Sequence, residues 1–367
     1  MASTVRVDRA QAMAYRVTAL GLAQRADRRP ADLPVLDLGV QEYTPDSMQV
    51  ALAARTSAGL ADDRLIMVWA ARGAPHLHRR AELPALMAAL WPVSDADAAA
   101  RIKSPQIADG AKLGVAAFTA TAAAFREVLG KPMPRGEVSR EVSARVPVEL
   151  TYECRACAAR HVSGSVWQHS GLAGAVEVQS RGKDAMLSPI PRLPGPPRTN
   201  AGVDGLIRTY LRYLGPAGPA EVAKYVGSTT AEFRRVWPDD LVEVELDGRR
   251  GWVPADAETK LRTVKPVAGV RLIPPMDALL QARDRDLLVP DKAQQKEVWR
   301  VLGNPGVLLV DGEVAGVWRA KMSGRRRVDL TVTPFGRLTP AVRRAVEAEA
   351  PVVARARGAG DAALTYA

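Results

Sequence analysis

The stretch that decides the fold spans residues 203–254 and reads VDGLIRTYLRYLGPAGPAEVAKYVGSTTAEFRRVWPDDLVEVELDGRRGWVP. Its apolar spacing and turn residues predict short helices, and Asp247-Gly248 is the strongest short signal for a β-hairpin. The expected elements are helices at 203–214, 220–226 and 230–236 and strands at 241–246 and 251–254. Helix, turn, helix and hairpin within about 55 residues is the order of a winged helix.

The same order of elements is expected twice more before this stretch. In the first occurrence, helices at 7–25 and 47–56 frame a loop at 38–44 and precede strand-like runs at 64–69 and 74–78. In the second occurrence, helices at 111–129 and 135–144 precede strand-like runs at 146–152 and 161–168. Each occurrence is a candidate winged-helix unit.

A proline-rich segment and a strand-rich segment complete the organisation. Residues 188–199 (SPIPRLPGPPRT) hold five prolines and are expected to form a stiff linker, because proline cannot donate to a strand ladder. Strands are then expected at 269–273, 306–310, 313–320 and 327–333, with a tight turn at Asp311-Gly312 and a helix at 340–349. The predicted fold is α+β, with three tandem winged-helix units followed by a small C-terminal β-barrel or sheet. The expected parts are winged helix 1 (1–95), winged helix 2 (96–187), the linker (188–199), winged helix 3 (200–260) and the barrel with the C-terminal helix (261–367).

Charge and composition narrow the class of partner. The chain has 367 residues, and 51 Lys and Arg against 40 Asp and Glu give a formal net charge of +11, which favours a polyanion such as nucleic acid. Aromatic residues make up only 5%, which argues against a single-strand binder built on stacked rings and favours duplex DNA. No apolar run is long enough to span a membrane, and residues 1–16 lack the apolar core of a signal peptide. We therefore expect a cytoplasmic protein, and a monomer.

Four short stretches, taken in order, resemble a known family. They read LGVQEY (38–43), VWAARGAPHL (68–77), VRLIPPMDALLQARDR (270–285) and PGVLLVDGEVAGVWR (305–319). Together they resemble the AlkZ-like proteins, winged-helix DNA glycosylases of the azinomycin-resistance type. The resemblance implies three winged-helix units and a β-barrel that embrace duplex DNA.

The same resemblance points to candidate catalytic residues in the first stretch. The family motif places two polar residues around an apolar one, and this chain has Gln41, Glu42 and Tyr43 in the matching loop. The amide of Gln41 is expected to orient a water, Glu42 to stabilise positive charge on the sugar, and Tyr43 to donate a hydrogen bond. The alternative for Gln41 is an ordinary loop amide that satisfies backbone groups.

Candidate DNA contacts come from the second stretch and from three arginine clusters at expected tips. His76 and His78 are expected on opposite faces of a short ribbon, which would exclude a shared metal, and a structural histidine is the alternative for His76. For the arginines the alternative is a solvated charged surface. The candidate contacts are Arg72, His76, Arg234, Arg235, Arg249, Arg250, Arg325, Arg326 and Arg327.

A pair of cysteines raises the possibility of structural zinc. Cys154 and Cys157 have C-x-x-C spacing, and His161 follows four residues later, with His169 as a possible fourth ligand. A reduced, metal-free hairpin is the alternative, and no cofactor is expected for catalysis. A thioredoxin-like redox pair is less favoured, because the βαβ context of that motif is missing.

Two classes of function remain open at this point. The first is a DNA glycosylase that hydrolyses the N-glycosidic bonds of alkylated purines in duplex DNA. The second is a winged-helix protein that binds DNA without chemistry, as a regulator or a damage binder. Convergence of Gln41 and a polar partner in a concave, basic pocket would favour the first, and arginine clusters that face different directions would favour a protein that does not act on nucleic acid.

Overall fold

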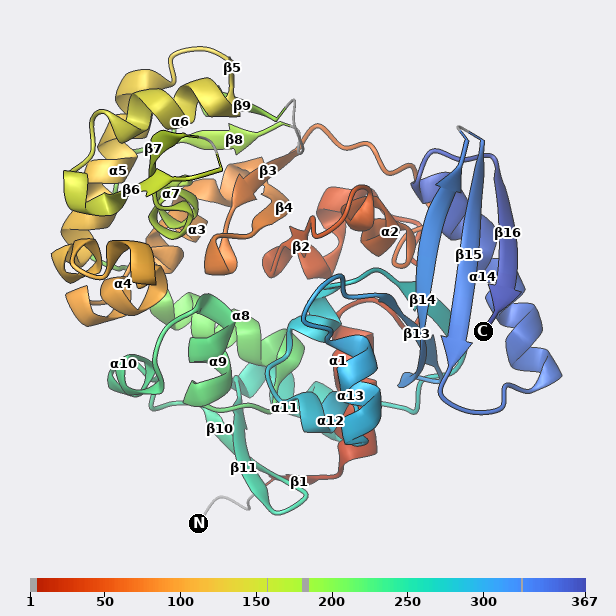
Figure 1. The fold of residues 1–367 in the computed structure, drawn as a ribbon. Helices are drawn as coiled ribbons and strands as arrows, with labels where there is room; N and C mark the ends of the chain where they lie inside the picture. Colours follow the sequence, from red (N-terminus) through yellow and green to blue (C-terminus); the bar gives the residue numbers. More distant parts are fainter. Residues whose placement is uncertain (1–4, 157, 180–184, 325) are drawn as a thin grey trace. The chain divides into compact units, whose positions relative to one another are not determined.

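The computed structural model describes residues 5–156, 158–179, 185–324 and 326–367 (Figure 1). The chain divides into two compact units. Unit 1 comprises Met1–Asp63, Arg208–Gly218 and Asp239–Ala367, and unit 2 comprises Arg64–Ile207 and Pro219–Pro238. The two ends of the chain thus belong to one unit and most of its middle to the other. No helix among the described residues is long and apolar enough to cross a membrane.

The largest sheet of unit 1 is an open half-barrel. Its order is β12-β13-β14-β15-β16, antiparallel except for the parallel pair β15–β16. The strands are β12 (Val270–Ile273), β13 (Gly306–Val310), β14 (Glu313–Ser323), β15 (Arg327–Pro334) and β16 (Asp361–Tyr366). Helix α14 (Pro340–Ala356) makes the crossover that a parallel pair requires, and it lies behind the sheet in Figure 1.

Of the barrel or sheet expected at the C-terminus, the structure shows an open sheet, for a packing reason. Val346, Ala350 and Val353 of α14 pack against strand residues that include Leu308 and Leu330, so the helix fills the face on which a barrel would close. Helix α2 (Ser47–Ala53) belongs to the same core through Val50 and Ala53. The strands therefore stay open around a helix.

Two predicted hairpin turns are confirmed. Asp247 and Gly248 have φ values of 46° and 76°, and Asp311 and Gly312 have 51° and 84°. Positive φ at both central residues is the type I′ turn, whose twist matches that of the flanking strands. The first joins β10 (Val242–Leu246) to β11 (Arg249–Val253), and the second joins β13 to β14.

The N-terminal helix begins later than expected. The helix predicted over 7–25 is α1 (Arg9–Ala19), because the side chain of Asp8 accepts a hydrogen bond from Gln11 N and caps it there. Residues Val5–Val7 instead form β1, which pairs in parallel with β10 and gives the sheet β1-β10-β11. That pairing joins segments more than 230 residues apart and has no local signal.

Unit 2 packs helices around an aromatic core. Trp69, Phe125 and Trp167 lie with ring centroids 4.4 to 6.4 Å apart. The helices are α3 (Leu83–Leu90), α4 (Asp95–Ile102), α5 (Val115–Val128), α6 (Arg135–Ser143), α7 (Gly164–Ser170), α9 (Pro219–Val226) and α10 (Thr230–Arg235). The strands are β3 (Leu65–Trp69), β4 (Pro75–Arg79), β5 (Met133–Pro134), β6 (Thr151–Cys154), β7 (Ala159–Val162), β8 (Val176–Val178) and β9 (Met186–Pro189).

Two expectations about unit 2 are wrong. The strand expected over 161–168 ends at Val162, and α7 takes over from Gly164, where Val166 and Trp167 are buried as on one face of a helix. The first two residues of the proline-rich segment belong to a strand, since Ser188 and Pro189 pair with β8. Pro189 is the last residue of β9 and lies beyond the pairing with β5, which ends at Leu187, so only β8 adjoins it and its missing N–H is tolerated.

The remaining elements include the first helix of residues 203–254. Helix α8 (Val203–Leu214) has the predicted bounds, and the division between the units falls within it. The others are β2 (Val40–Gln41), α11 (Ala255–Thr263), α12 (Arg285–Leu288) and α13 (Lys292–Val298). The mixed α+β class is confirmed, whereas the division of the rest of the chain into winged-helix units and a linker stays a prediction.

Candidate active-site loop and DNA contacts

The candidate catalytic loop lies between a short 3-10 helix and α2 in unit 1. The 3-10 helix Pro34–Asp37 is followed by Leu38 and then by Gly39, whose φ of 81° turns the chain into β2. Gln41 closes β2 with 8% of its surface exposed, and Glu42 follows with 7%. Both side chains are therefore held in the interior and not on a solvated loop.

Glu42 caps the N-terminus of α2. Its carboxylate accepts hydrogen bonds from Asp46 N (3.0 Å), Met48 N (2.8 Å) and Ser47 Oγ (3.1 Å). Asp46 occupies the N-cap position with φ 65° and makes no side-chain cap bond, so the acid four residues earlier serves that purpose. A negative charge is also favoured there by the helix dipole. This geometry engages the carboxylate of Glu42 in ordering the backbone before α2.

Ser47 ties the rest of the loop to the same cap. Its Oγ accepts from Tyr43 N (2.9 Å) and Thr44 N (3.2 Å) while donating to Glu42. The hydroxyl of the half-buried Tyr43 accepts from Asn304 N at 3.4 Å, in the segment before β13. The backbone that follows Gln41 is thus fixed by a continuous set of hydrogen bonds.

In unit 2, the second stretch forms the turn between β3 and β4. Arg72 (φ 59°) and Gly73 (φ 67°) both adopt the left-handed conformation. A Cβ on Gly73 would lie 2.8 Å from Gln168 Cβ, so only glycine fits. The guanidinium of Arg72 donates to the carbonyl of Tyr225 and lies 5.1 Å from the centre of its ring, which fastens the turn to α9.

The histidines of β4 share one face of the strand. Residues two apart in a strand point the same way, so the expectation that His76 and His78 point apart is wrong. Their ring centroids lie 6.0 Å apart and both side chains are buried. The Nδ1 of His76 lies 2.8 Å from the carbonyl of Ala74, a contact that suits a structural histidine. Direct contact of His76 with DNA stays a prediction.

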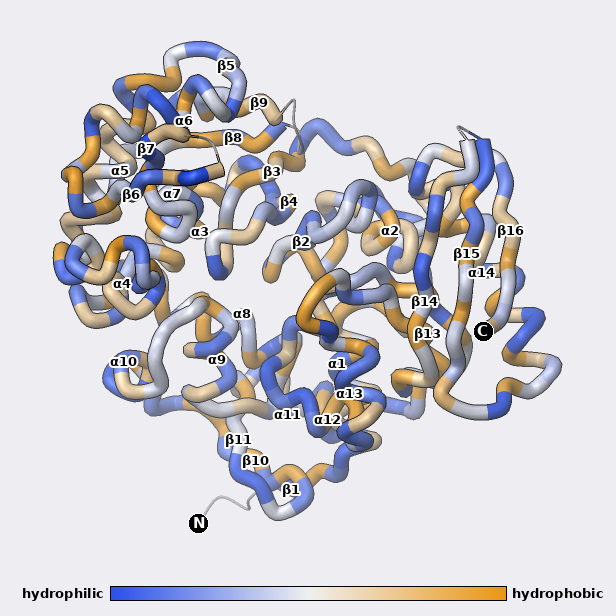
Figure 2. The backbone as a smooth tube through the Cα atoms, viewed as in Figure 1, coloured by the Kyte–Doolittle hydropathy of each residue, from blue (hydrophilic) through white to orange (hydrophobic). Residues whose placement is uncertain are grey.

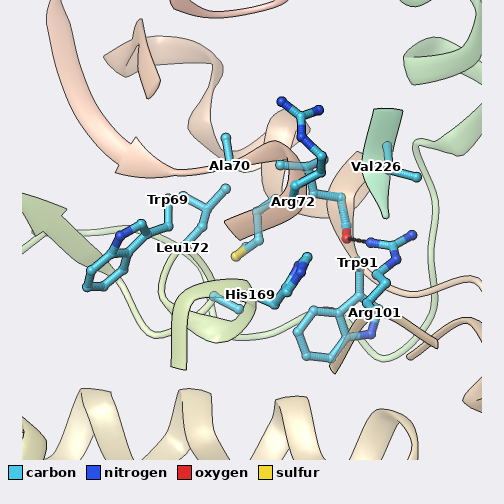
Figure 3. A pocket seen from close by; sticks show the side chains of 11 residues that line it. Trp69, Ala70, Arg72, Trp91, Arg101, His169, Leu172 and Val226 are labelled. Atoms are coloured by element: carbon cyan, nitrogen blue, oxygen red, sulfur yellow. Dashed lines mark hydrogen bonds between the residues drawn. The ribbon is translucent and has the colours of Figure 1, made fainter. Parts of the chain in front are cut away.

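A small cavity with a mostly apolar lining lies beside the β3–β4 turn (Figure 3). Its volume of about 20 Å³ suits roughly one water, and its lining includes Arg72, Arg101 and His169. Arg101 is held by Asp97 at 2.6 Å and by the carbonyl of Leu90 at 2.7 Å. Burial, and then the nearby charge of Arg101, lower the pKa of His169 to about 3, so this histidine is neutral at pH 7.

Neither described hollow contains the candidate catalytic trio. The larger one, about 690 Å³, lies in unit 1 and is lined by residues of α1 and α11, Tyr15 and Lys260 among them. Residues 41–43 line neither that hollow nor the cavity at His169. The convergent pocket that would favour catalysis is therefore not among these two hollows.

The described arginines of the three clusters are exposed. Arg249 and Arg250 begin β11 just after its turn, and Arg327 begins β15. In Figure 1 the strand pairs β10–β11 and β14–β15 lie in different parts of unit 1. Several of these cations have acidic neighbours, as in the pairs Arg250–Glu243 (3.1 Å) and Arg327–Asp329 (2.9 Å). The remaining candidates are the exposed Arg234 and Arg235 of α10, the exposed Arg326, and Arg325, which lies outside the described residues.

The comparisons with known proteins decide the family. The family model described as DNA glycosylase AlkZ-like matches residues 12–356. The chain belongs to the AlkZ-like DNA glycosylase family. A curated relative, the interstrand DNA cross-link repair glycosylase of Streptomyces sahachiroi, is 33% identical over 160 residues. That match spans 40% of this chain and 41% of the relative.

A solved structure extends the likeness to the whole fold. The DNA glycosylase AlkZ of Streptomyces sahachiroi matches with a TM-score of 0.74 at 22% identity, over 99% of this chain and 100% of that one. The predicted resemblance to the AlkZ-like family is thereby confirmed. The α+β architecture with its half-barrel sheet is shared with that structure.

The third AlkZ-like stretch carries buried acids that the sequence did not single out. Asp277 binds Arg55 through two contacts of 2.8 Å, and both side chains are fully buried. Asp284 binds Arg16 of α1 at 2.6 Å. Arg55 also donates to the carbonyls of Leu20 and Ala51, so each guanidinium ties the N-terminal helices to the chain near residue 280. The sequence signal for these acids was the stretch 270–285 itself, which served only as evidence of the family resemblance.

Zinc binding lacks support in the described part of the chain. Cys154 lies on β6 and His161 on β7, on the same face of the hairpin, because Tyr152 is opposite His161 and two residues before Cys154. Cys157 lies outside the described residues. Among the residues that are described, no group of three or more His, Cys, Asp or Glu is placed to hold a metal.

Proposed function

We propose that this chain is a DNA glycosylase that hydrolyses the N-glycosidic bond of cationic N-alkyl purines in duplex DNA. The observation that carries the proposal is the family match over residues 12–356, which includes a rigidly held Gln41 loop. The curated relative, an interstrand DNA cross-link repair glycosylase, supports a repair role on damaged DNA.

The proposed reaction requires few catalytic groups from the protein. An N7-alkylated purine already carries positive charge and leaves readily, so the reaction needs a positioned water more than a strong acid. In the proposal, the amide carbonyl of Gln41 orients that water and stabilises the positively charged sugar. Glu42 acts through the loop it caps, and Tyr43 supports the loop from the side of Asn304. Water is the only co-reactant, so no cofactor is required.

DNA binding in the proposal rests on charge and on the order of elements. Helices α8, α9 and α10 precede the hairpin β10–β11 in the chain, which is the winged-helix order, and exposed arginines lie on α10 and β11. The net charge of +11 favours phosphate contact. Within this proposal the chain acts as a cytoplasmic monomer with three winged-helix units, and the arginines neutralise phosphates without reading bases.

The direct test measures release of free base from a duplex that contains N7-methylguanine. Gln41→Ala should abolish release while leaving duplex affinity within a few-fold, because catalysis and phosphate binding fall on different residues. Gln106→Ala, an exposed glutamine in unit 2, is the matched control and should behave as wild type. A fully active Gln41→Ala variant would contradict the proposed role of Gln41.

A non-catalytic DNA binder is the second candidate, and one observation favours it. The carboxylate of Glu42 is engaged at the α2 N-terminus, and Tyr43 replaces the polar residue that the family motif has at that position. The loop therefore presents Gln41 without the family's second polar partner. Wild-type protein that binds duplex tightly and releases no base from N7-methylguanine DNA would establish this candidate instead.

A further inference from the structure

Unit 1 presents two large apolar side chains to solvent side by side. Val301 is 99% exposed and Leu302 is 86% exposed, in the segment between α13 and β13 that is orange in Figure 2. The other exposed large apolar residues of the described chain are Val148 at 57% and Leu113 at 37%. Single exposed apolar residues are ordinary, but an adjacent pair with almost no covering requires an explanation.

The apolar tip is held from both sides. On the side of α13, Trp299 donates through Nε1 to the carbonyl of Leu280 (3.3 Å), and Arg285 covers its ring at 4.8 Å. On the side of β13, Arg319 donates to the carbonyl of Gly303 (2.8 Å), where the chain turns with φ 67°. The anchored base leaves Val301 and Leu302 projecting and does not let them fold back onto the protein.

The tip adjoins the candidate catalytic loop. Asn304, two residues after Leu302, donates its backbone N–H to the hydroxyl of Tyr43 at 3.4 Å. Tyr43 is in turn two residues from Gln41, and its own N–H is fixed by Ser47. The projecting pair and the proposed water-orienting amide therefore belong to one connected part of unit 1.

The surroundings of the tip match nucleic acid better than a protein partner. Arg300, which also pairs with Glu297 at 3.7 Å, precedes the pair, and the exposed side chain of Arg319 braces the loop, so cations flank two apolar groups. A stable protein interface covers about 800 Å² on each partner, far more than two side chains offer. Proteins that unstack DNA use one or two apolar side chains of this kind between base pairs, with cations on the adjacent phosphates.

We propose that Val301 and Leu302 form a wedge that enters the base stack beside the lesion and fills the space left by the extruded nucleotide. This inference rests on the proposed glycosylase function, because an enzyme that acts on a base must remove it from the stack. The wedge holds the duplex open while the flipped purine lies near Gln41. No bond is made or broken by the wedge itself.

The test uses the full chain and the double variant Val301→Ser/Leu302→Ser. Both side chains are solvent-exposed, so thermal unfolding should match that of wild type, and this is checked first. The probe is a duplex with 2-aminopurine beside N7-methylguanine, whose fluorescence rises when the base next to it unstacks. The double variant should lose most of the rise on binding, and single-turnover base release from the duplex should fall about tenfold or more.

Two comparisons make the result specific. Release from a single-stranded oligonucleotide with the same lesion should change less than about twofold, because there is no stack to open. Val148→Ser, which removes an exposed apolar side chain from unit 2, should behave as wild type in both assays.

Three other outcomes would contradict the wedge proposal. An unchanged fluorescence rise in the double variant, an equal loss in Val148→Ser, or a wild-type dimer that the double variant dissociates would each contradict it. Failure of the glycosylase proposal is recognised separately, since the fluorescence rise is read before any base is released. A protein that unstacks DNA through residues 301 and 302 yet releases no base would retain the wedge and lose the chemistry.

Discussion

At the scale of single residues, the loop shows how neighbouring positions take different roles. Gln41 and Glu42 are adjacent and equally buried, yet the carboxylate of Glu42 is turned toward the backbone N–H groups of Asp46 and Met48. A helix start leaves N–H groups unsatisfied, and a buried carboxylate needs donors, so each satisfies the other. The charged residue of the motif thus shapes the loop.

Glu42→Ala is expected to lower the free energy of unfolding by about 1–3 kcal/mol, because buried N–H groups lose a charged acceptor. Glu42→Gln, which keeps one acceptor oxygen, should lose less and should retain more base release. Urea unfolding and the N7-methylguanine assay measure the two effects. If Glu42→Gln kept full stability but lost all activity, a direct chemical role for the carboxylate would replace positioning.

His169 predicts a pH dependence of stability. Its pKa is lowered to about 3 by burial, while an unfolded histidine titrates near 6.5. Below pH 6.5 the unfolded chain binds a proton that the folded chain does not, so stability falls as pH falls from about 6.5 toward 3, by at most roughly 1.4 kcal/mol per pH unit from this group.

His169→Gln should remove that contribution and flatten the acid side of the stability curve. Urea midpoints at pH 7 and pH 5 give the comparison with wild type. A loss between the two pH values as large as that of wild type would show that other groups are responsible.

At the scale of elements, buried ion pairs join segments that are distant in sequence. Arg55 and Asp277 are 222 residues apart, and Arg16 and Asp284 are 268 residues apart. Such pairs stabilise little when intact but cost much when one partner is removed, because a buried charge is left alone. The AlkZ-like stretch 270–285 therefore carries residues that assemble unit 1.

Asp277→Ala should destabilise the protein by about 3–5 kcal/mol, since Arg55 would stay buried without its carboxylate. Asp286→Ala is the matched control, because this acid pairs with Lys292 on the exposed surface of α12. Its unfolding midpoint should stay close to that of wild type. Equal effects of the two substitutions, measured by urea unfolding, would remove the case for the buried pair.

At the scale of the whole molecule, net charge predicts how the protein binds DNA. The excess of +11 and the exposed arginines imply phosphate neutralisation, so the logarithm of duplex affinity should fall with the logarithm of salt by about 0.9 per phosphate contact. Arg249→Ala/Arg250→Ala should weaken binding to all sequences alike and reduce that slope by roughly one for each lost contact.

Fluorescence anisotropy across a salt series measures this slope, and Arg6→Ala on the neighbouring strand β1 is the control for charge alone. Loss confined to particular sequences would indicate base readout. A slope near zero in wild type would argue against phosphate contact as the basis of binding.

The sequence by itself determined the elements whose signals are local. Helix α8 and strand β13 have the predicted bounds, and the Asp-Gly turns form where expected, because apolar spacing and positive-φ residues act over a few positions. The family motifs located the Gln41 loop in the same way. Turns and helix bounds depend on residues a few positions apart, so they can be predicted without knowledge of the tertiary fold.

Only the tertiary structure decided what depends on distant partners. The parallel pairings of β1 with β10 and of β15 with β16 join strands that local patterns cannot match. The cap made by Glu42, the neutral His169 and the uncovered Val301–Leu302 pair likewise depend on which side chains surround a residue once the chain is folded. The burial of a side chain and the charges around it depend on which residues lie near it in the folded chain. A sequence pattern specifies the residue types but not these neighbours.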